Sequence, residues 1–235
     1  MNSDKILRLE IDSSVCLTGE GDPVQRRTRV KICGITRPED ARLASQLGAD
    51  ALGLVFYAGS PRGVDLQQAQ AIRAAVPAFV SLVGLFVNPE RKQVDDVLAC
   101  LRLDCLQFHG EEEPDFCQSF AMPYMKAVRV RSGTDPMVAM KAHRQASAIL
   151  LDSYDPEQAG GTGKRFDWTV ARHCVDRSPL PIVLAGGLTQ DNAARAIKEV
   201  HPWALDLSSG VEKEPGIKDP QRLQAFFNEV NRVRI

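Results

Sequence analysis

The chain has 235 residues, 44% of them hydrophobic and 25% charged, which is the composition of a folded globular protein and excludes wholesale disorder. The 29 Lys and Arg residues nearly balance the 30 Asp and Glu residues, so a net charge of −1 leaves no excess of cations to bind a nucleic-acid backbone. The longest apolar run, residues 78–87, is far shorter than the ~18 residues that a membrane-spanning helix needs. We therefore expect a soluble protein with neither a nucleic-acid nor a membrane partner.

The first thirty residues do not resemble a signal peptide, because Arg8 and Glu10 interrupt the apolar residues there. The six cysteines form no Cys-x-x-Cys pair and are too sparse for a disulfide scaffold. We therefore expect reduced thiols and a cytoplasmic location. The sequence does not determine the oligomeric state, and a monomer is the working expectation.

Residues 1–28 stand apart from the pattern that follows. We expect them to form an N-terminal extension that is flexible or loosely docked, although the alternation over 5–11 could instead supply an edge strand. Residues 29–235 contain no linker or change in composition, which predicts a single domain.

From residue 29 onward, short apolar runs alternate with polar segments of helical period. The runs predict strands at 30–33, 51–56, 79–86, 105–109, 124–130, 148–152, 181–185 and 204–207. Apolar residues at successive positions suit strands that are covered on both faces, as in parallel sheets. The alternation predicts a (β/α)8 barrel, and an open doubly wound sheet is the alternative.

Capping residues and prolines indicate where several helices begin. Thr36 and Glu39 fit a capping box, and Asn88-Pro89, Asp135-Pro136 and Asp219-Pro220 each place a capping side chain before a proline. A helix is expected over 89–101, and the short helix over 114–120 has the weakest signal.

The active site of such a barrel lies at the carboxyl ends of its strands. The polar or reactive residues expected at these ends are Cys33, Arg62, His109, Arg129, Asp152, Gly186, Gly187, Asp206, Ser208, Ser209 and Gly210. They share one rim only if the barrel topology is correct.

The loops after the last two strands have the composition of an anion site. Gly186 and Gly187, and then Ser208, Ser209 and Gly210, would let backbone N–H groups approach a phosphate closely. Barrels often bind phosphate between these two loops, although glycine could also serve the turns alone.

Cys33 and Asp152 are candidates for proton transfer. A helix N-terminus and a nearby cation could favour a Cys33 thiolate, but a free cysteine could also be a small buried hydrophobe. Burial of Asp152 at the end of an apolar strand would favour its protonated form, and the alternatives are a helix cap or a partner for Arg129.

Several other motifs fail. Residues 160–164 lack the spacing and the Ser or Thr of a phosphate-binding P-loop, and are better interpreted as part of a mobile active-site loop. His109-Gly110-Glu111 is not followed by the Pro-Cys-x-x-Cys of a zinc deaminase, and the remaining histidines suggest no ligand set. We expect neither a metal nor another cofactor.

Sequence blocks in a fixed order resemble the phosphoribosylanthranilate isomerase family of tryptophan biosynthesis. They are VKICGIT at 30–36, SPRGV at 60–64, LFVN at 85–88, LQFHG at 106–110, LDS at 151–153, GGTGK at 160–164 with FDW at 166–168, LAGGL at 184–188 with Asn192, and LDLSSGVE at 205–212 before PG at 215–216 and KD at 218–219. Each block alone is weak evidence, whereas the whole ordered set is highly specific. Phe108, Ala204 and Leu207 are small departures from the family pattern, and residues 1–28 lie outside it.

The resemblance implies an Amadori rearrangement of N-(5-phosphoribosyl)anthranilate. It places the general base at Cys33, the general acid at Asp152 and the arginine that meets the anthranilate carboxylate at Arg62. It further implies substrate contacts for His109 and Asp206, and a phosphate site at the two glycine- and serine-containing loops.

Other functions for the same fold remain open. Indole-glycerol-phosphate synthase would require a catalytic lysine at a strand end, and the ribosyl isomerase of histidine synthesis commonly uses an aspartate where Cys33 stands. A phosphosugar-binding barrel without catalysis is the non-enzymatic alternative.

Overall fold

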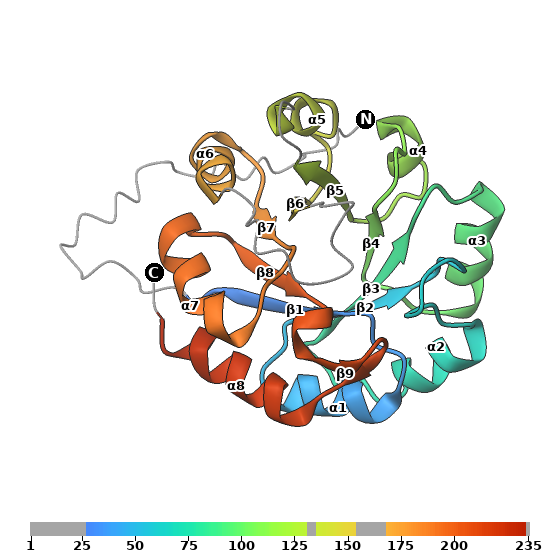
Figure 1. Ribbon diagram of the computed structural model, residues 1–235. Coiled ribbons are helices and arrows are strands. Elements are labelled where there is room, and N and C mark those ends of the chain that lie inside the picture. The colour runs from blue at the N-terminus through green and yellow to red at the C-terminus, as the bar shows by residue number, and fades with distance from the viewer. Residues whose placement is uncertain (1–26, 131–134, 154–167, 234–235) are drawn as a thin grey trace, which may run out of the picture.

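The computed structural model describes residues 27–130, 135–153 and 168–233. Its centre is a closed barrel in which each strand pairs in parallel with the next and β8 pairs with β1 (Figure 1). The strands are β1 Arg29–Cys33, β2 Ala51–Val55, β3 Ser81–Phe86, β4 Cys105–Phe108, β5 Tyr124–Val130, β6 Ala148–Ser153, β7 Ile182–Leu184 and β8 Ala204–Leu207. The predicted (β/α)8 barrel is confirmed, and the open sheet is excluded.

Helices surround the barrel and cover its outer surface (Figure 1). They are α1 Pro38–Gln46, α2 Leu66–Arg73, α3 Arg91–Cys100, α4 Pro114–Gln118, α5 Pro136–Ala142, α6 Trp168–Arg177, α7 Gln190–Val200 and α8 Pro220–Asn231. No helix in the described ranges is long and apolar enough to cross a membrane.

The strands bury both faces. Alternate side chains such as Ile32 and Leu52 pack outward in the main core between the strands and the helices. The inward side chains form a second apolar cluster that includes Met125 and Leu150. Lys31 and Cys33 lie on this inward face, because they alternate with Val30 and Ile32.

Some predicted boundaries are wrong. β3 begins at Ser81 rather than at residue 79, where Phe79 has a positive φ of 68° and its side chain is exposed. β4 ends at Phe108, and β7 is shorter than predicted.

Two of the predicted helix caps are also wrong. The N-cap of α1 is Arg37 and has no side-chain cap, while the Thr36 hydroxyl donates to the Gly216 carbonyl instead. α3 begins two residues beyond Pro89, with Glu90 as its N-cap. The caps at Asp135 and Asp219 are confirmed.

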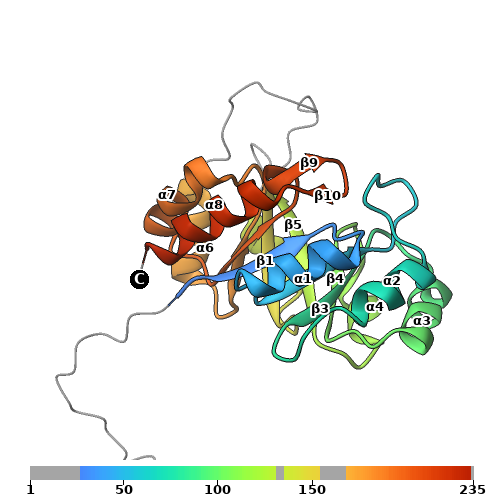
Figure 2. The same cartoon turned by 90° about the horizontal axis from the view of Figure 1, so that it is seen from below.

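A small hairpin, which the sequence pattern did not predict, follows the barrel. The 3-10 turn Ser209–Val211 leads into β9 Glu212–Glu214, which pairs antiparallel with β10 Ile217–Lys218. Figure 2 shows the hairpin at the same end of the barrel as the loop between β2 and α2. The hairpin therefore lies beside the carboxyl ends of the strands.

The predicted N-terminal extension is described only at Arg27 and Thr28, so its suggested edge strand at 5–11 lies outside the described residues. Arg27 pairs with Asp50 on the barrel, and Thr28 is buried. The glycine-rich loop predicted at 160–164 also lies outside the described residues.

Candidate active site

The closed parallel barrel brings the carboxyl ends of all eight strands to one rim. Cys33 is the last residue of β1, His109 directly follows β4, and Asp152 is the penultimate residue of β6. Asp206 lies one residue before the end of β8; its charge acts on Cys33, and the charges of His109 and Asp152 act on Asp206. The predicted acid, base and substrate-contact residues of the strands therefore meet at the same end of the barrel.

The Cys33 thiol lies above a buried ion pair. Lys31 Nζ is 2.9 Å from Asp206 Oδ1, and both side chains are almost fully buried. Gly53, on the neighbouring strand β2, provides the space for this arrangement: a Cβ there would lie 2.8 Å from Cys33 Sγ and 3.0 Å from Lys31 Nζ. The Lys31 ammonium and the Cys33 thiol therefore both occupy the space left by the missing side chain of Gly53.

Burial and charge act on Cys33 in opposite directions. Burial raises the pKa of the Cys33 thiol, and the adjacent Lys31 ammonium opposes this rise. Burial alone would lower the pKa of Lys31, but the Asp206 carboxylate raises it, so Lys31 remains protonated. The expected nearby cation is therefore present, but burial outweighs it, and the resting form of Cys33 is the thiol.

Asp152 is held by a histidine. His109 Nε2 lies 3.1 Å from Asp152 Oδ2, and Gln107 Nε2 lies 3.1 Å from His109 Nδ1. Because an amide nitrogen only donates, Nδ1 accepts and Nε2 carries the proton that it donates to Asp152. The Asp152 side chain is 27% exposed, so the burial expected for it is only partial.

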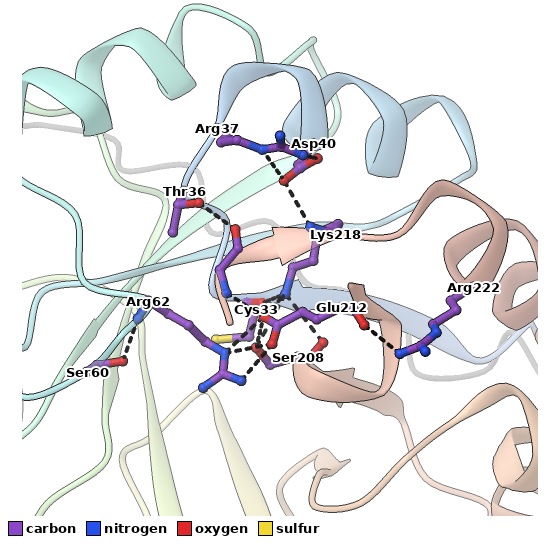
Figure 3. Close-up of polar contacts among 11 residues, drawn as sticks. Cys33, Thr36, Arg37, Asp40, Ser60, Arg62, Ser208, Glu212, Lys218 and Arg222 are labelled. Atoms are coloured by element: carbon purple, nitrogen blue, oxygen red, sulfur yellow. Dashed lines mark hydrogen bonds and ion pairs between the residues drawn. The ribbon is translucent and has the colours of Figure 1, made fainter. Parts of the chain in front are cut away.

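Arg62 reaches the rim from the loop after β2 and is held by Glu212 of the hairpin. Its Nε and Nη2 donate to the Glu212 carboxylate, with Nη2 only 2.6 Å from Oε2 (Figure 3). The Arg62 side chain is 24% exposed, whereas that of Glu212 is 4% exposed. The sequence identified Arg62 as a site residue, but it gave Glu212 no role.

The loops after β7 and β8 form a cavity of about 460 Å³. Gly187, Ser209 and Gly210 line it, together with Leu188, Thr189, Gln190, Asp191 and Arg222. Gly186 and Gly187 both have positive φ, at 84° and 63°, which favours glycine. The N-terminus of α7 opens into this cavity and provides backbone N–H groups suited to an anion.

Two of the predicted phosphate residues lie beside the cavity. Gly186 directly precedes Gly187, the first residue of the β7 loop that lines the cavity. The Ser208 hydroxyl lies 3.2 Å from Glu212 Oε1. Arg222 was not predicted, because a single arginine in the first turn of a helix has no distinguishing sequence pattern. Among the described residues, no cluster of His, Cys, Asp and Glu has the composition of a metal site.

Comparison with known proteins agrees with this geometry. Residues 30–229 match the family model of N-(5'-phosphoribosyl)anthranilate isomerase. The chain is 53% identical over 204 residues to the Pseudomonas fluorescens protein of that name, covering 87% of this chain and 96% of the relative.

Solved structures agree as well. The chain resembles the crystal structure of phosphoribosyl anthranilate isomerase from Thermotoga maritima, with a TM-score of 0.81, 41% identity and coverage of 88% of this chain and 100% of that one. A second such structure, in complex with reduced 1-(o-carboxyphenylamino)-1-deoxyribulose 5-phosphate, gives a TM-score of 0.78 and 38% identity over 88% of this chain and 100% of its own. The chain therefore belongs to the N-(5'-phosphoribosyl)anthranilate isomerase family.

Proposed function

We propose that the chain catalyses the Amadori rearrangement of N-(5'-phosphoribosyl)anthranilate to 1-(2-carboxyphenylamino)-1-deoxyribulose 5-phosphate, a step of tryptophan biosynthesis. The observation that carries this proposal is the meeting of Cys33, Asp206 and Asp152 at one rim of the barrel, beside the cavity lined by Gly187 and Ser209. A proton acceptor, a proton donor and an anion site are the groups that this reaction needs.

The first step is opening of the ribose ring. Asp152, in its protonated form, gives its proton to the ring oxygen as the bond between that oxygen and C1' breaks. The nitrogen lone pair forms a double bond to C1', which yields an iminium ion. The hydrogen bond from His109 Nε2 holds the Asp152 carboxyl group in place for this transfer.

The second step removes a proton from C2'. The positive iminium acidifies this proton, and the Cys33 thiolate takes it. The electrons of the C–H bond form a double bond between C2' and C1', while the electrons of the C1'–N double bond return to nitrogen as a lone pair. The Lys31 ammonium stabilises the thiolate that must form for this step. The enolamine then becomes the ketone as the 2'-hydroxyl loses its proton and C1' gains one.

Binding uses the two ends of the substrate. The cavity between the β7 and β8 loops would hold the phosphate on the backbone N–H groups at the start of α7, with Arg222 as a nearby cation. Arg62 would bind the anthranilate carboxylate. Because these contacts lie away from the reacting carbons, their binding energy orients the sugar between Cys33 and Asp152.

The test is a fluorescence assay on freshly generated phosphoribosylanthranilate with the variants Cys33→Ala and Asp152→Asn. Each should lower kcat by at least about 100-fold while the reduced product analogue still binds. Cys100→Ala, a change at an exposed cysteine of α3, is the matched control and should retain full activity. Unchanged turnover in a site variant would remove that residue from the mechanism, and ligand binding without turnover in the parent would favour the non-catalytic barrel.

We also propose that residues 29–235 act as one catalytic domain, as a monomer in the cytoplasm. The closed barrel satisfies its own strand edges, and the five described cysteines are free. With a net charge of −1, the chain has no excess of cations for nucleic acid. Size-exclusion chromatography with light scattering tests the monomer, and a dimer mass would contradict it.

A further inference from the structure

The hairpin after β8 contains a buried ion pair that has no role in the reaction described above. Lys218, on β10, is completely buried, and its Nζ lies 2.8 Å from Glu212 Oε1 on β9. Two buried charges are costly to remove from water. Their presence beside an active site therefore needs an explanation beyond the stability of a two-stranded hairpin.

Lys218 connects the hairpin to the strand that carries the proposed base. Its Nζ donates to the Cys33 carbonyl at 2.6 Å and also lies 3.3 Å from Ser208 Oγ (Figure 3). Its backbone N–H donates to Asp40 on α1 at 3.1 Å. One lysine thus joins the carboxyl ends of β1 and β8 to the first helix.

Glu212 connects the same lysine to Arg62. Its Oε1 accepts from Lys218 Nζ and from Arg62 Nε at 2.9 Å, and its Oε2 accepts from Arg62 Nη2. Figure 3 shows Arg62 and Lys218 approaching the carboxylate from different directions. Although burial would raise the pKa of Glu212, hydrogen bonds from Arg62 and Lys218 lower it to about 2, so the carboxylate stays charged.

The charges of this cluster do not cancel. Burial lowers the pKa of Lys218, and the hydrogen bond with Glu212 opposes this decrease. With Lys218 protonated, one carboxylate is shared by two cations, and Arg62 is the more exposed of the two. Glu212 engages Nε and Nη2, so Nη1 forms the other edge of the guanidinium. That edge and the surplus charge suit a second, incoming carboxylate.

We propose that Glu212 and Lys218 are positioning residues: they fix Arg62 in the orientation that binds the substrate carboxylate and tie that subsite to the strand end that carries Cys33. The inference rests on the proposed function, in which Arg62 meets the anthranilate carboxylate. It assigns a role to the Glu212 and Lys218 positions of the last sequence block.

The test compares two ligands that differ only in the carboxylate: the reduced product analogue and its phenylamino counterpart. In the parent protein the carboxylated ligand should bind more tightly. The measured ratio is the dissociation constant of the phenylamino ligand divided by that of the carboxylated ligand. In Glu212→Gln this ratio should fall by roughly ten-fold or more, because Arg62 loses its charged hydrogen-bond partner. Effects on the phosphate site cancel in this ratio. Glu214→Gln, the same change at an exposed position of β9, should leave the ratio unchanged.

A second variant covers the case in which Glu212→Gln does not fold. The double variant Glu212→Gln/Lys218→Gln removes both charges of the pair, so that no unpaired lysine is left buried, and it should lower the ratio similarly. An unchanged ratio in a folded variant would overturn the inference. If Arg62→Ala also leaves the ratio unchanged, the proposed role of Arg62 is wrong as well. If the ratio falls in Arg62→Ala but not in the Glu212 variants, only the positioning role of Glu212 and Lys218 is overturned.

Discussion

Lys31 is the residue whose charge most directly affects the proposed base. It faces Cys33 from the same strand, and Asp206 keeps it protonated. Since burial already raises the pKa of the Cys33 thiol, removing the ammonium should raise this pKa further. In Lys31→Met, the rise of kcat/KM with increasing pH should therefore occur at higher pH than in the parent. The increase in the rate of Cys33 alkylation by iodoacetamide should shift to higher pH in the same way.

The control for this experiment is Lys92→Met, which removes an exposed lysine of α3. Its pH profile should match that of the parent. A Lys31→Met protein that is folded and keeps the parental pH profile would show that Lys31 does not support the thiolate. Because the change leaves Asp206 without its cation, circular dichroism should first establish that the barrel is intact.

The sequence predicted the candidate site residues that stand at strand ends, and it missed the residues that contact and orient them. Cys33 and Asp152 follow apolar runs, so the barrel rule places them at the rim. Lys31 received no role from the sequence pattern, although its spacing of two from Cys33 puts both side chains on one face of the strand. Glu212 and Lys218 were not assigned roles because hydrogen bonding across a short hairpin produces no sequence period.

At the scale of single elements, the helix caps differ in a way that stability measurements can detect. Asp65 caps α2 with a side chain that accepts from Gln68 N at 2.8 Å, whereas Glu90 begins α3 without a side-chain cap. Asp65→Ala should lower the free energy of unfolding by about 1 kcal/mol, and Glu90→Ala should have little effect. Urea denaturation followed by circular dichroism measures both, and equal losses would contradict the assignment of the caps.

Comparison of α5 and α8 with α3 shows why the first residues of some helices could be predicted from the sequence and those of others could not. Asp135 and Asp219 stand directly before a proline that begins a helix, and both act as caps. Asn88 also precedes a proline, but its backbone has a positive φ of 44° and its side chain accepts from Glu111 N instead. A tertiary contact between two loops thus replaced the local cap, and no local pattern predicts such a contact.

At the scale of the whole molecule, the barrel interior combines apolar and charged side chains. Val83, Met125, Ala127, Leu150 and Val183 belong to its apolar cluster. The Lys31–Asp206 pair occupies the same interior below Cys33. A buried pair of this kind contributes little to stability compared with apolar packing. Its position fits a role in the chemistry at the rim, and the core outside the strands carries most of the hydrophobic stabilisation.

The stability of the whole barrel should fall in mild acid because of one buried histidine. His143 is 5% exposed at the end of α5, packs against the Tyr124 ring, and its Nδ1 has no hydrogen-bond partner among the described residues. Burial, with a smaller contribution from Lys126, lowers the pKa of His143 from 6.5 to about 4.

Between these two pH values the unfolded chain binds a proton that the folded protein does not, so the free energy of unfolding should fall as the pH drops from about 6.5 to about 4, by up to roughly 3 kcal/mol. Urea denaturation at a series of pH values measures this slope. His143→Gln should reduce it, whereas His201→Asn, at an exposed position with a positive φ of 53°, should leave it unchanged. An identical slope in the parent and in His143→Gln would mean that other groups cause the acid sensitivity, and that His143 is protonated as readily in the folded barrel as in the unfolded chain.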